Sequence, residues 1–409
     1  MKILTDPAEF ETDKSPAQPK KMSASYFVWI LGSAGLISAA DNWIVAPVLP
    51  SIAASFHVSV AQTAWILTAY MILYGFMQPF HGFFSERLGR VWLLRRLMLG
   101  LTAGTLACAF ASSLIWLCVA RFVTGFFAAG MIAVSLALIG DRVAENSRQT
   151  VVGRFMGIVF LGQGVSVGLG GVVAKYMSWR AIFFTFAFAA AGSGLLLGKL
   201  HERSFTPSPQ GLMEQIRQAT ATRSARRIYL SALAAGFLLL GMYNFSGAFL
   251  QKVSGLDPLQ TGGVIMFFGF SCLLAGKFSG SISRCIATKR TILAGTTLGI
   301  FAATTLAMSA DWRLAWLAIV ALGTGYILVQ STLATLAFGV GPNGVASALV
   351  GLGLFGGGGL SSALGSMILA HSSYRTLWRF FAVGTLLMLL FVAVQKSIAD
   401  LHTRSGHQP

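Results

Sequence analysis

Hydrophobic positions along this chain gather into twelve long runs, separated by segments that carry most of its charged residues. A helix needs about 20 largely apolar residues to cross the hydrocarbon layer of a bilayer, and each run is close to that length. The pattern therefore predicts twelve transmembrane helices. We expect them at residues 24–49, 63–84, 95–112, 115–139, 153–174, 180–198, 229–250, 260–282, 291–309, 314–338, 346–370 and 376–395.

The segment at 199–228 is longer than the others and divides the chain. It contains a short amphipathic pattern that starts at Gly211, which predicts a surface-lying helix within a solvated linker. We expect this linker to have no regulatory role. The organisation that follows is a tail at 1–23, an N-terminal six-helix bundle at 24–198, a C-terminal six-helix bundle at 229–395 and a tail at 396–409.

The two predicted bundles are related by an internal repeat. The segment that starts at Gly82 and ends at Arg90 recurs, at one constant offset, as the segment from Gly276 to Arg284. Two parallel halves with a substrate site between them near the midplane are a transporter architecture. The predicted fold class is therefore an all-α polytopic membrane protein with two pseudo-symmetric six-helix halves.

Charge adds an orientation to this picture. The chain has 30 Lys and Arg against 13 Asp and Glu, and most of the basic residues fall in segments on the same side as the N-terminus. The positive-inside rule then places both termini in the cytoplasm, for a multi-pass protein of the cell inner (plasma) membrane. We expect these basic segments to meet the anionic lipids of the bilayer. No basic stretch is interleaved with aromatic residues on a soluble domain, so nucleic acid is not an expected partner.

The strongest motif lies between the second and third runs. It reads Gly82-x-x-x-Glu86-Arg87-x-Gly89-Arg90 and resembles the loop motif of the major facilitator superfamily (MFS), with Glu86 where the family normally has Asp. The whole chain resembles the family's twelve-span drug:proton antiporter branch. The resemblance implies the MFS fold and a conformational latch, in which the acid and the arginines bridge to neighbouring helix ends and hold the outward-open state. The alternative is that these arginines are only topology signals.

Two other segments match the family in part. The first run ends with Asp41, an apolar stretch and Leu-Pro50, which is similar to the family's first-helix signature. The fourth run keeps an arginine of the family pattern as Arg121, but has Thr124 in place of a glutamine. The resemblance associates this arginine with proton transfer.

The fifth run carries a frame of glycines that matches the antiporter motif of the family. Small residues at such spacing let helices pack closely. The motif has Gly-Pro where this chain has Ser166-Val167, and the missing proline leaves the direction of transport open between export and import. The helix-packing glycines that we identify are Gly153, Gly162, Gly170 and Gly171.

Asp41 is the only acidic residue inside a predicted span. A charge at membrane depth is costly, and such a residue normally faces a cavity or a partner. Burial favours the neutral form of a carboxyl group, whereas a nearby cation favours the charged form. Three interpretations therefore stay open for Asp41: a proton acceptor, a counter-ion for a cationic substrate, or a structural partner of Arg121. We expect Asp41 and Arg121 to form the proton-coupling site.

Uncharged polar residues within the runs are candidates to line a substrate cavity. Three of them on the second run are spaced four residues apart, which places them on one helix face. Each candidate has an alternative role, in which it hydrogen-bonds a neighbouring helix. The predicted cavity residues are Asn42, Tyr70, Tyr74, Gln78, Gln163, Tyr243, Asn244, Tyr326 and Gln330.

The remaining chemistry narrows the function. The runs contain no paired histidines and no cysteines at metal-ligand spacing, and the chain has no phosphate-binding loop, so we expect no metal, no cofactor and no ATP. The runs contain no nucleophile–base set that would indicate an enzyme. The chain also has no sizeable soluble domain that would indicate a receptor. We predict a monomeric proton-coupled secondary transporter that exports small organic or drug-like solutes by antiport. The alternatives are proton symport or import of a metabolite, and transport of a lipid-like substrate.

Overall fold

The computed structural model describes residues 23–394 except 46–47, 64 and 203–208, and the regular structure within these residues is helical. Ten of the described helices are long and apolar enough to cross a membrane, and α1 and the α4–α5 pair complete the twelve crossings. The crossings are α1 (Ala24–Trp43), α4 (Trp65–Phe76) with α5 (Gln78–Leu88), α6 (Arg90–Ala109), α7 (Leu114–Arg142), α8 (Glu145–Tyr176), α9 (Trp179–Leu197), α11 (Arg223–Ala235) with the π-helical turn η2 (Gly236–Leu240) and α12 (Gly241–Lys252), α13 (Pro258–Ile286), α14 (Thr288–Met308), α15 (Trp312–Ala337), α16 (Asn343–His371) and α17 (Tyr374–Val394).

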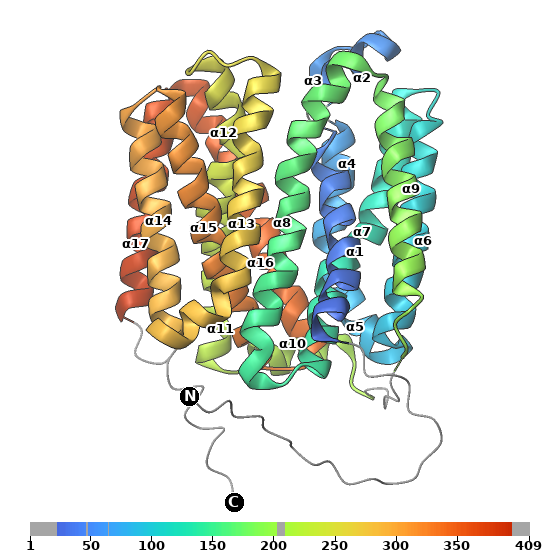
Figure 1. The fold of residues 1–409 in the computed structure, drawn as a ribbon, viewed down its shortest axis with the longest axis vertical. Coiled ribbons are helices and arrows are strands. Elements are labelled where there is room, and N and C mark those ends of the chain that lie inside the picture. Colours follow the sequence, from blue (N-terminus) through green and yellow to red (C-terminus); the bar gives the residue numbers. More distant parts are fainter. Residues whose placement is uncertain (1–22, 46–47, 64, 203–208, 395–409) are drawn as a thin grey trace, which may run out of the picture.

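The helices form two bundles that stand side by side (Figure 1). Helices α1 to α9 make the N-terminal half, and helices α11 to α17 make the C-terminal half. The halves meet where α8 packs along α13, and where α16 packs against α5 and α7. This arrangement confirms the predicted fold of two six-helix halves.

Several helices begin before the apolar runs that predicted them. Helix α6 starts at Arg90 instead of residue 95, α8 starts at Glu145 instead of 153, and α11 starts at Arg223 instead of 229. The apolar run marks only the part of a helix that crosses hydrocarbon. The backbone hydrogen bonds of the helix continue beyond it, where polar side chains reach the head groups or water.

Two predicted spans are interrupted. The first run was predicted to extend to residue 49, but α1 ends at Trp43 and the short helix α2 (Leu49–Phe56) follows, with Pro50 in its first turn. Proline is favoured there because the first helical N–H groups have no intrahelical partner. The second run divides at Met77, just before Pro79, because proline inside a helix removes one backbone hydrogen bond and clashes with the preceding turn.

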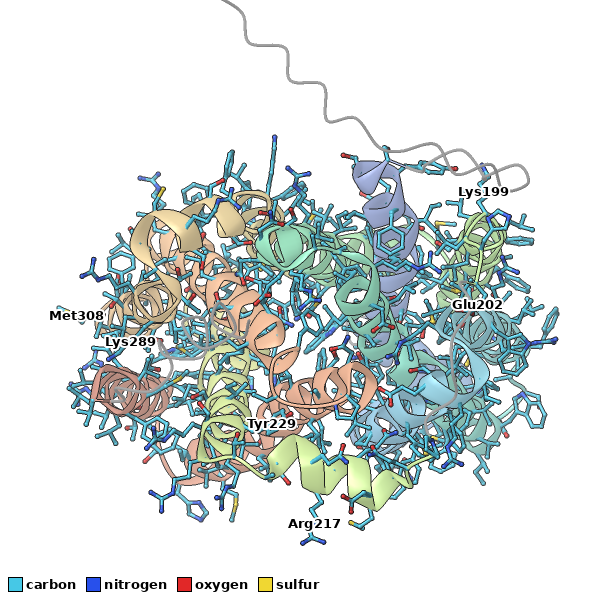
Figure 2. All side chains as sticks on the ribbon, turned by 90° about the horizontal axis from the view of Figure 1, so that it is seen from below. Lys199, Glu202, Arg217, Tyr229, Lys289 and Met308 are labelled. Carbon is cyan, nitrogen blue, oxygen red and sulfur yellow. The ribbon has the colours of Figure 1, made fainter. Side chains whose placement is uncertain are left out.

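The predicted amphipathic linker helix is present as α10 (Leu212–Thr220). Its apolar face packs with Phe83 of α5 and Val345 of α16, so this helix touches both halves. Figure 2, seen from below, shows Arg217 of α10 pointing away from the protein. We call the end of the bundle that carries α10, Glu86 and Arg90 the latch end.

The junction between α8 and α13 depends on glycine. A Cβ atom at Gly157 would lie 2.9 Å from the carbonyl oxygen of Cys272 and 3.0 Å from the Cα of Leu273. A Cβ atom at Gly164 would lie 2.7 Å from the backbone nitrogen of Gly269. The two halves therefore meet with their backbones in direct contact, as small residues allow in membranes.

The predicted packing glycines do not all face the same neighbour. Gly153 faces α13, where a Cβ atom would lie 2.6 Å from the carbonyl oxygen of Gly276. Gly162 faces α1, where a Cβ atom would lie 2.8 Å from the Cγ of Leu36. Gly170 is buried within α8, and Gly171 is also helical, but its surroundings lie outside the described residues.

We expect Gly157→Val to destabilise the purified protein by about 1–3 kcal/mol, the usual cost of an overpacked contact. The valine methyls would have to displace the α13 backbone at Cys272 and Leu273. Thermal unfolding in detergent measures the effect. Gly192→Val in α9 is the control, since no atom lies within 4 Å of a Cβ there. Equal losses of stability in the two variants would contradict the close α8–α13 junction.

Candidate functional site

Asp41 and Arg121 form a buried ion pair. Arg121 Nη1 donates to Asp41 Oδ2 over 2.7 Å, and Nη2 donates to the Asp41 carbonyl oxygen over 3.3 Å. The Thr105 hydroxyl of α6 donates to Asp41 Oδ1 over 3.1 Å. The two charged residues are 1% and 0% exposed. Because α1 ends at Trp43 and not at the predicted residue 49, Asp41 lies in the last turn of this helix.

The helices around this pair place Arg121 over an aromatic ring. Its guanidinium carbon lies 4.2 Å from the centroid of Tyr70, a cation–π distance. One turn further along α7, Gly125 allows the close approach of α4, since a Cβ there would lie 3.0 Å from the Tyr70 Cα. Among the described residues, Arg121 Nε has no hydrogen-bond partner. The guanidinium therefore contacts the Asp41 carboxylate, a carbonyl oxygen and an aromatic ring. Among the ion pairs of the described residues, Asp41 is the only acid that pairs with Arg121.

Aromatic contacts lead from this pair to the contact between the halves. Tyr70 and Tyr74 stack with ring centroids 5.6 Å apart, and Tyr74 meets Phe355 of α16 edge-on at 5.2 Å. Tyr326 of α15 meets Phe160 of α8 edge-on at 4.9 Å. Tyr243 of α12 meets Trp43 of α1 edge-on at 5.3 Å. The structure therefore brings predicted cavity residues from α4, α12 and α15 to the contact between the halves.

Many of the predicted cavity residues have a buried polar atom that lacks a hydrogen-bond partner in the described part of the chain. Such atoms are costly to bury and are rare in folded proteins. The Tyr243 hydroxyl and the Gln163 amide lie near each other without a well-formed hydrogen bond. These groups are donors and acceptors available to a polar ligand. The atoms are Gln78 Nε2, Gln163 Nε2, Tyr243 Oη, Asn244 Oδ1, Tyr326 Oη and Gln330 Oε1.

The two asparagines contact neighbouring helices. Asn42 Nδ2 lies 3.6 Å from the Met71 sulfur of α4. Asn244 Nδ2 donates to the Gly358 carbonyl oxygen over 3.2 Å and to the Ser362 hydroxyl over 2.9 Å, both on α16. Asn244 therefore fulfils, with its amide nitrogen, the alternative role stated above for each polar residue: it hydrogen-bonds a neighbouring helix.

At the latch end, Glu86 joins the two halves. Glu86 Oε1 accepts a hydrogen bond from the backbone N–H of Gly344 over 2.8 Å, at the N-terminus of α16. Arg90 contacts Glu86 at 3.4 Å and pairs with Asp141 of α7 at 2.7 Å. Asn343 Nδ2 donates to the other Asp141 oxygen over 2.8 Å. The anionic side chains of the N-terminal half thus contact the positive end of an α16 dipole in the C-terminal half.

The other motif residues have separate roles. A Cβ atom at Gly82 would lie 2.8 Å from the Gly344 carbonyl carbon, so glycine permits α5 to touch α16. Gly89 has φ 95° between α5 and α6, a conformation that glycine adopts without strain. Arg87 differs from the expected bridge to a helix end, because it donates to the Gln210 carbonyl oxygen of the linker over 3.0 Å.

Asp141, Asn343 and Gly344 also belong to the latch, although they were not among its predicted residues. Asp141 follows the fourth apolar run, and Pro-Asn-Gly precedes the eleventh, which is a helix-start pattern. Those signals locate a helix end, but they do not say which helix ends meet.

The repeated motif in the C-terminal half lacks the acid. Gly280 occupies the position that matches Glu86, and Arg284, which matches Arg90, donates to the neutral Thr150 hydroxyl over 3.4 Å. The Ser279 hydroxyl lies 3.3 Å from the Gln149 carbonyl oxygen, and Gln149 Nε2 donates to Ser331 over 3.2 Å. Among the described residues, the acid–arginine contacts of the latch therefore lie on one side of the pseudo-twofold only.

Comparison with known proteins agrees with this geometry. The sequence profile described as Major Facilitator Superfamily matches residues 31–347. The chain belongs to this superfamily. Among MFS relatives, the multidrug efflux protein YfmO of Bacillus subtilis (strain 168) is 27% identical over 397 residues, which cover 93% of this chain and 95% of that protein. The MFS-type transporter TOXA of Cochliobolus carbonum is 29% identical over 201 residues, and the match covers 48% of this chain but only 36% of TOXA.

A solved MFS structure shares the fold. The human organic anion transporter MFSD10 (TETRAN) superposes with a TM-score of 0.76 over 92% of this chain and 100% of that one, at 14% sequence identity. At this identity the likeness establishes the architecture alone. Together, the family profile, the membrane-spanning helices and this architecture make the protein a multi-pass MFS membrane transporter and not an enzyme.

Proposed function

We propose that this MFS transporter is driven by the proton gradient and exports small organic or drug-like solutes by antiport. The observation that carries the proposal is the ion pair of Asp41 and Arg121, which is buried in the N-terminal half beside Thr105 and Tyr70. We further propose that the protein is a monomer in the cell inner membrane, that its latch end faces the cytoplasm, and that it uses no cofactor.

Protonation of Asp41 is incompatible with the ion pair that it forms here. A neutral carboxylic acid would leave the buried Arg121 cation without its counter-charge, and an unpaired buried charge costs several kcal/mol. A conformation that gives Arg121 another environment is then favoured, so proton binding shifts the equilibrium between two facing states. This is how a proton gradient would drive the transport cycle.

The latch supports alternating access. Glu86 and Asp141 connect the halves at the latch end, through Gly344 and Asn343 of α16. Any conformation that opens this end has to break these hydrogen bonds. The conformation described above therefore corresponds to the closed state of the latch end, and the open state is reached when α5 and α16 separate.

The direction of transport has two candidates. Export is supported by the similarity to a relative named as a multidrug efflux protein over nearly the whole chain. Import by proton symport is supported by Ser166-Val167, where the antiporter motif has Gly-Pro. The Ser166 hydroxyl donates to the Gln163 carbonyl oxygen over 2.9 Å within an uninterrupted α8, so this helix has no proline break.

In proteoliposomes, we expect an acidic interior to drive accumulation of a substrate cation, because outward proton flow is exchanged for inward substrate. The probe would be ethidium, or a stronger binder found by thermal-shift screening of drug-like cations, amino acids and sugars. Accumulation only with an acidic exterior would identify a symporter. Uptake that a protonophore leaves unchanged would contradict proton coupling altogether.

A further inference from the structure

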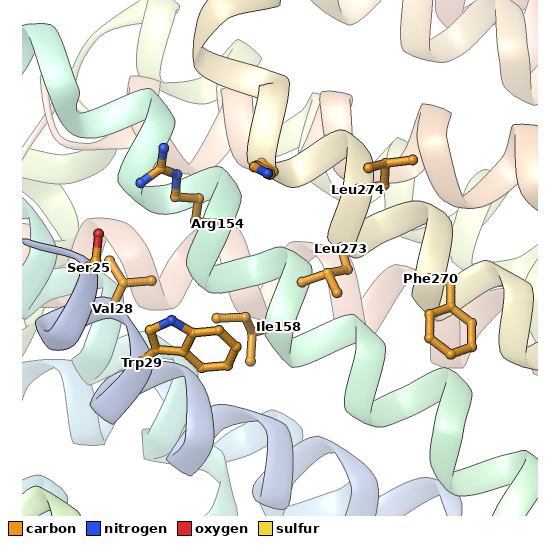
Figure 3. Close-up of a pocket in the computed structure, with 9 residues that line it drawn as sticks. Ser25, Val28, Trp29, Arg154, Ile158, Phe270, Leu273 and Leu274 are labelled. Carbon is orange, nitrogen blue, oxygen red and sulfur yellow. The ribbon is translucent and has the colours of Figure 1, made fainter.

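A groove opens on the membrane-facing side of the protein, where α1 and α8 of the N-terminal half meet α13 of the C-terminal half (Figure 3). Its volume is about 660 Å³. Two of the apolar side chains that line it are exposed, Trp29 to 62% and Phe270 to 43%. In the membrane this surface contacts lipid.

Polar and apolar residues of the groove are ordered in the same way on all three helices. Ser25 on α1, Arg154 on α8 and Lys277 on α13 lie nearest the latch end. Trp29 on α1 and Phe270 on α13 lie deeper. At 1.5 Å per helical residue, the apolar wall on α13 extends about 10 Å from Lys277 to Phe270, away from the latch end. The order matches a phospholipid, with its head group at the bilayer surface and its acyl chains inside.

The two cations of the groove have no acidic partner among the described residues. Within the part of the chain that the structure describes, Arg154 forms no ion pair or hydrogen bond. The Lys277 ammonium group lies 5.6 Å from the Phe278 ring. No acidic residue is among the described residues that line the groove. Within the described part of the chain, its outer end therefore carries two positive charges without an acidic partner.

We infer that this groove binds one anionic phospholipid of the leaflet at the latch end. Its phosphate would lie between Arg154 and Lys277, where charge-assisted hydrogen bonds are strong, and an acyl chain would lie along Trp29, Ile158 and Phe270.

The site would couple lipid binding to conformation. Arg154 belongs to the N-terminal half and Lys277 to the C-terminal half, so one phosphate bridges the two. Separation of α8 and α13 at the latch end would pull the two cations apart. A bound anionic lipid therefore stabilises the closed latch end. This inference does not rest on proton coupling or on the direction of transport.

The test uses the full-length protein in detergent, titrated with phosphatidylglycerol or with phosphatidylcholine of the same acyl chains. Native mass spectrometry measures the bound lipid, and thermal unfolding measures the stabilisation. We expect wild type to bind phosphatidylglycerol more tightly, and Arg154→Gln with Lys277→Gln to weaken that binding about tenfold or more, since two charge-assisted contacts are lost. Arg154→Lys keeps the charge and should retain most of the binding.

A charge-matched control separates a site from general attraction. Arg217→Gln with Arg290→Gln also removes two exposed arginines at the latch end, but both lie outside the groove. This variant should bind phosphatidylglycerol like wild type. Equal weakening in both double variants would overturn the proposal. Equal binding of phosphatidylcholine by wild type, or equal stabilisation by glycerol phosphate without acyl chains, would overturn it as well. If the double variant does not fold, the single variant Lys277→Gln takes its place in the binding measurement.

Discussion

Asp41→Asn is expected to abolish proton-driven accumulation of substrate in proteoliposomes, while substrate exchange without a gradient continues. Asparagine has nearly the same shape as aspartate but cannot take up a proton, so its charge no longer follows the gradient. The variant also leaves Arg121 buried without its counter-charge. We therefore expect a loss of stability of about 3–5 kcal/mol, the usual effect of breaking a buried ion pair from one side.

Two further variants separate coupling from folding. Asp41→Asn combined with Arg121→Gln removes both charges, and should recover stability relative to the single variant but remain uncoupled. Thr105→Val removes one hydrogen bond to Asp41 but keeps the carboxylate, so it should transport against the gradient. Full gradient-driven accumulation by a folded Asp41→Asn protein would rule out the coupling role and leave Asp41 as a structural partner of Arg121.

Glu86→Gln is expected to open the latch end more often. The variant keeps an oxygen that can accept from the Gly344 N–H, but it loses the negative charge at the N-terminus of α16 and beside Arg90. A hydrogen bond to a charged group is worth about 1.5–3 kcal/mol, and 1.4 kcal/mol is a tenfold change in an equilibrium. Amide hydrogen exchange in the first turn of α16 should therefore rise about tenfold.

Controls for this experiment lie at the same end of the protein. Glu214→Gln on α10 removes an exposed acid that forms no ion pair with the described residues, and should leave exchange in α16 unchanged. Asp141→Asn disrupts the contacts of both Arg90 and Asn343, and should raise exchange as Glu86→Gln does. If Glu86→Gln and Glu214→Gln behaved alike, the latch would have to be held by the close packing of Gly82 on α16 rather than by charge.

The substrate region shows how far side-chain spacing can be used. The four-residue spacing of Tyr70, Tyr74 and Gln78 predicts one helix face, and all three side chains are buried in the structure. Spacing could not show that Pro79 divides this helix, nor that Tyr74 meets Phe355 from the other half. Those features depend on backbone geometry and on which helices become neighbours.

The apolar runs, the repeat and the loop motif were sufficient to predict the twelve crossings, the two halves and the superfamily. These are properties of segments, because hydrocarbon thickness sets the length of each run and the repeat relates positions at a constant offset. The isolation of Asp41 was visible in the same way, as the one acid within a span. The partners of each charge were decided by tertiary structure.

Asp41 meets Arg121 across 80 residues of sequence, and Glu86 meets the Gly344 N–H across 258. Pairing over such distances depends on which helices pack together, and here glycines such as Gly125 set how closely the backbones approach. The hydrophobic pattern of a sequence describes one helix at a time. It does not specify which other helix that helix packs against, so only the folded protein could show which cation neutralises the buried acid.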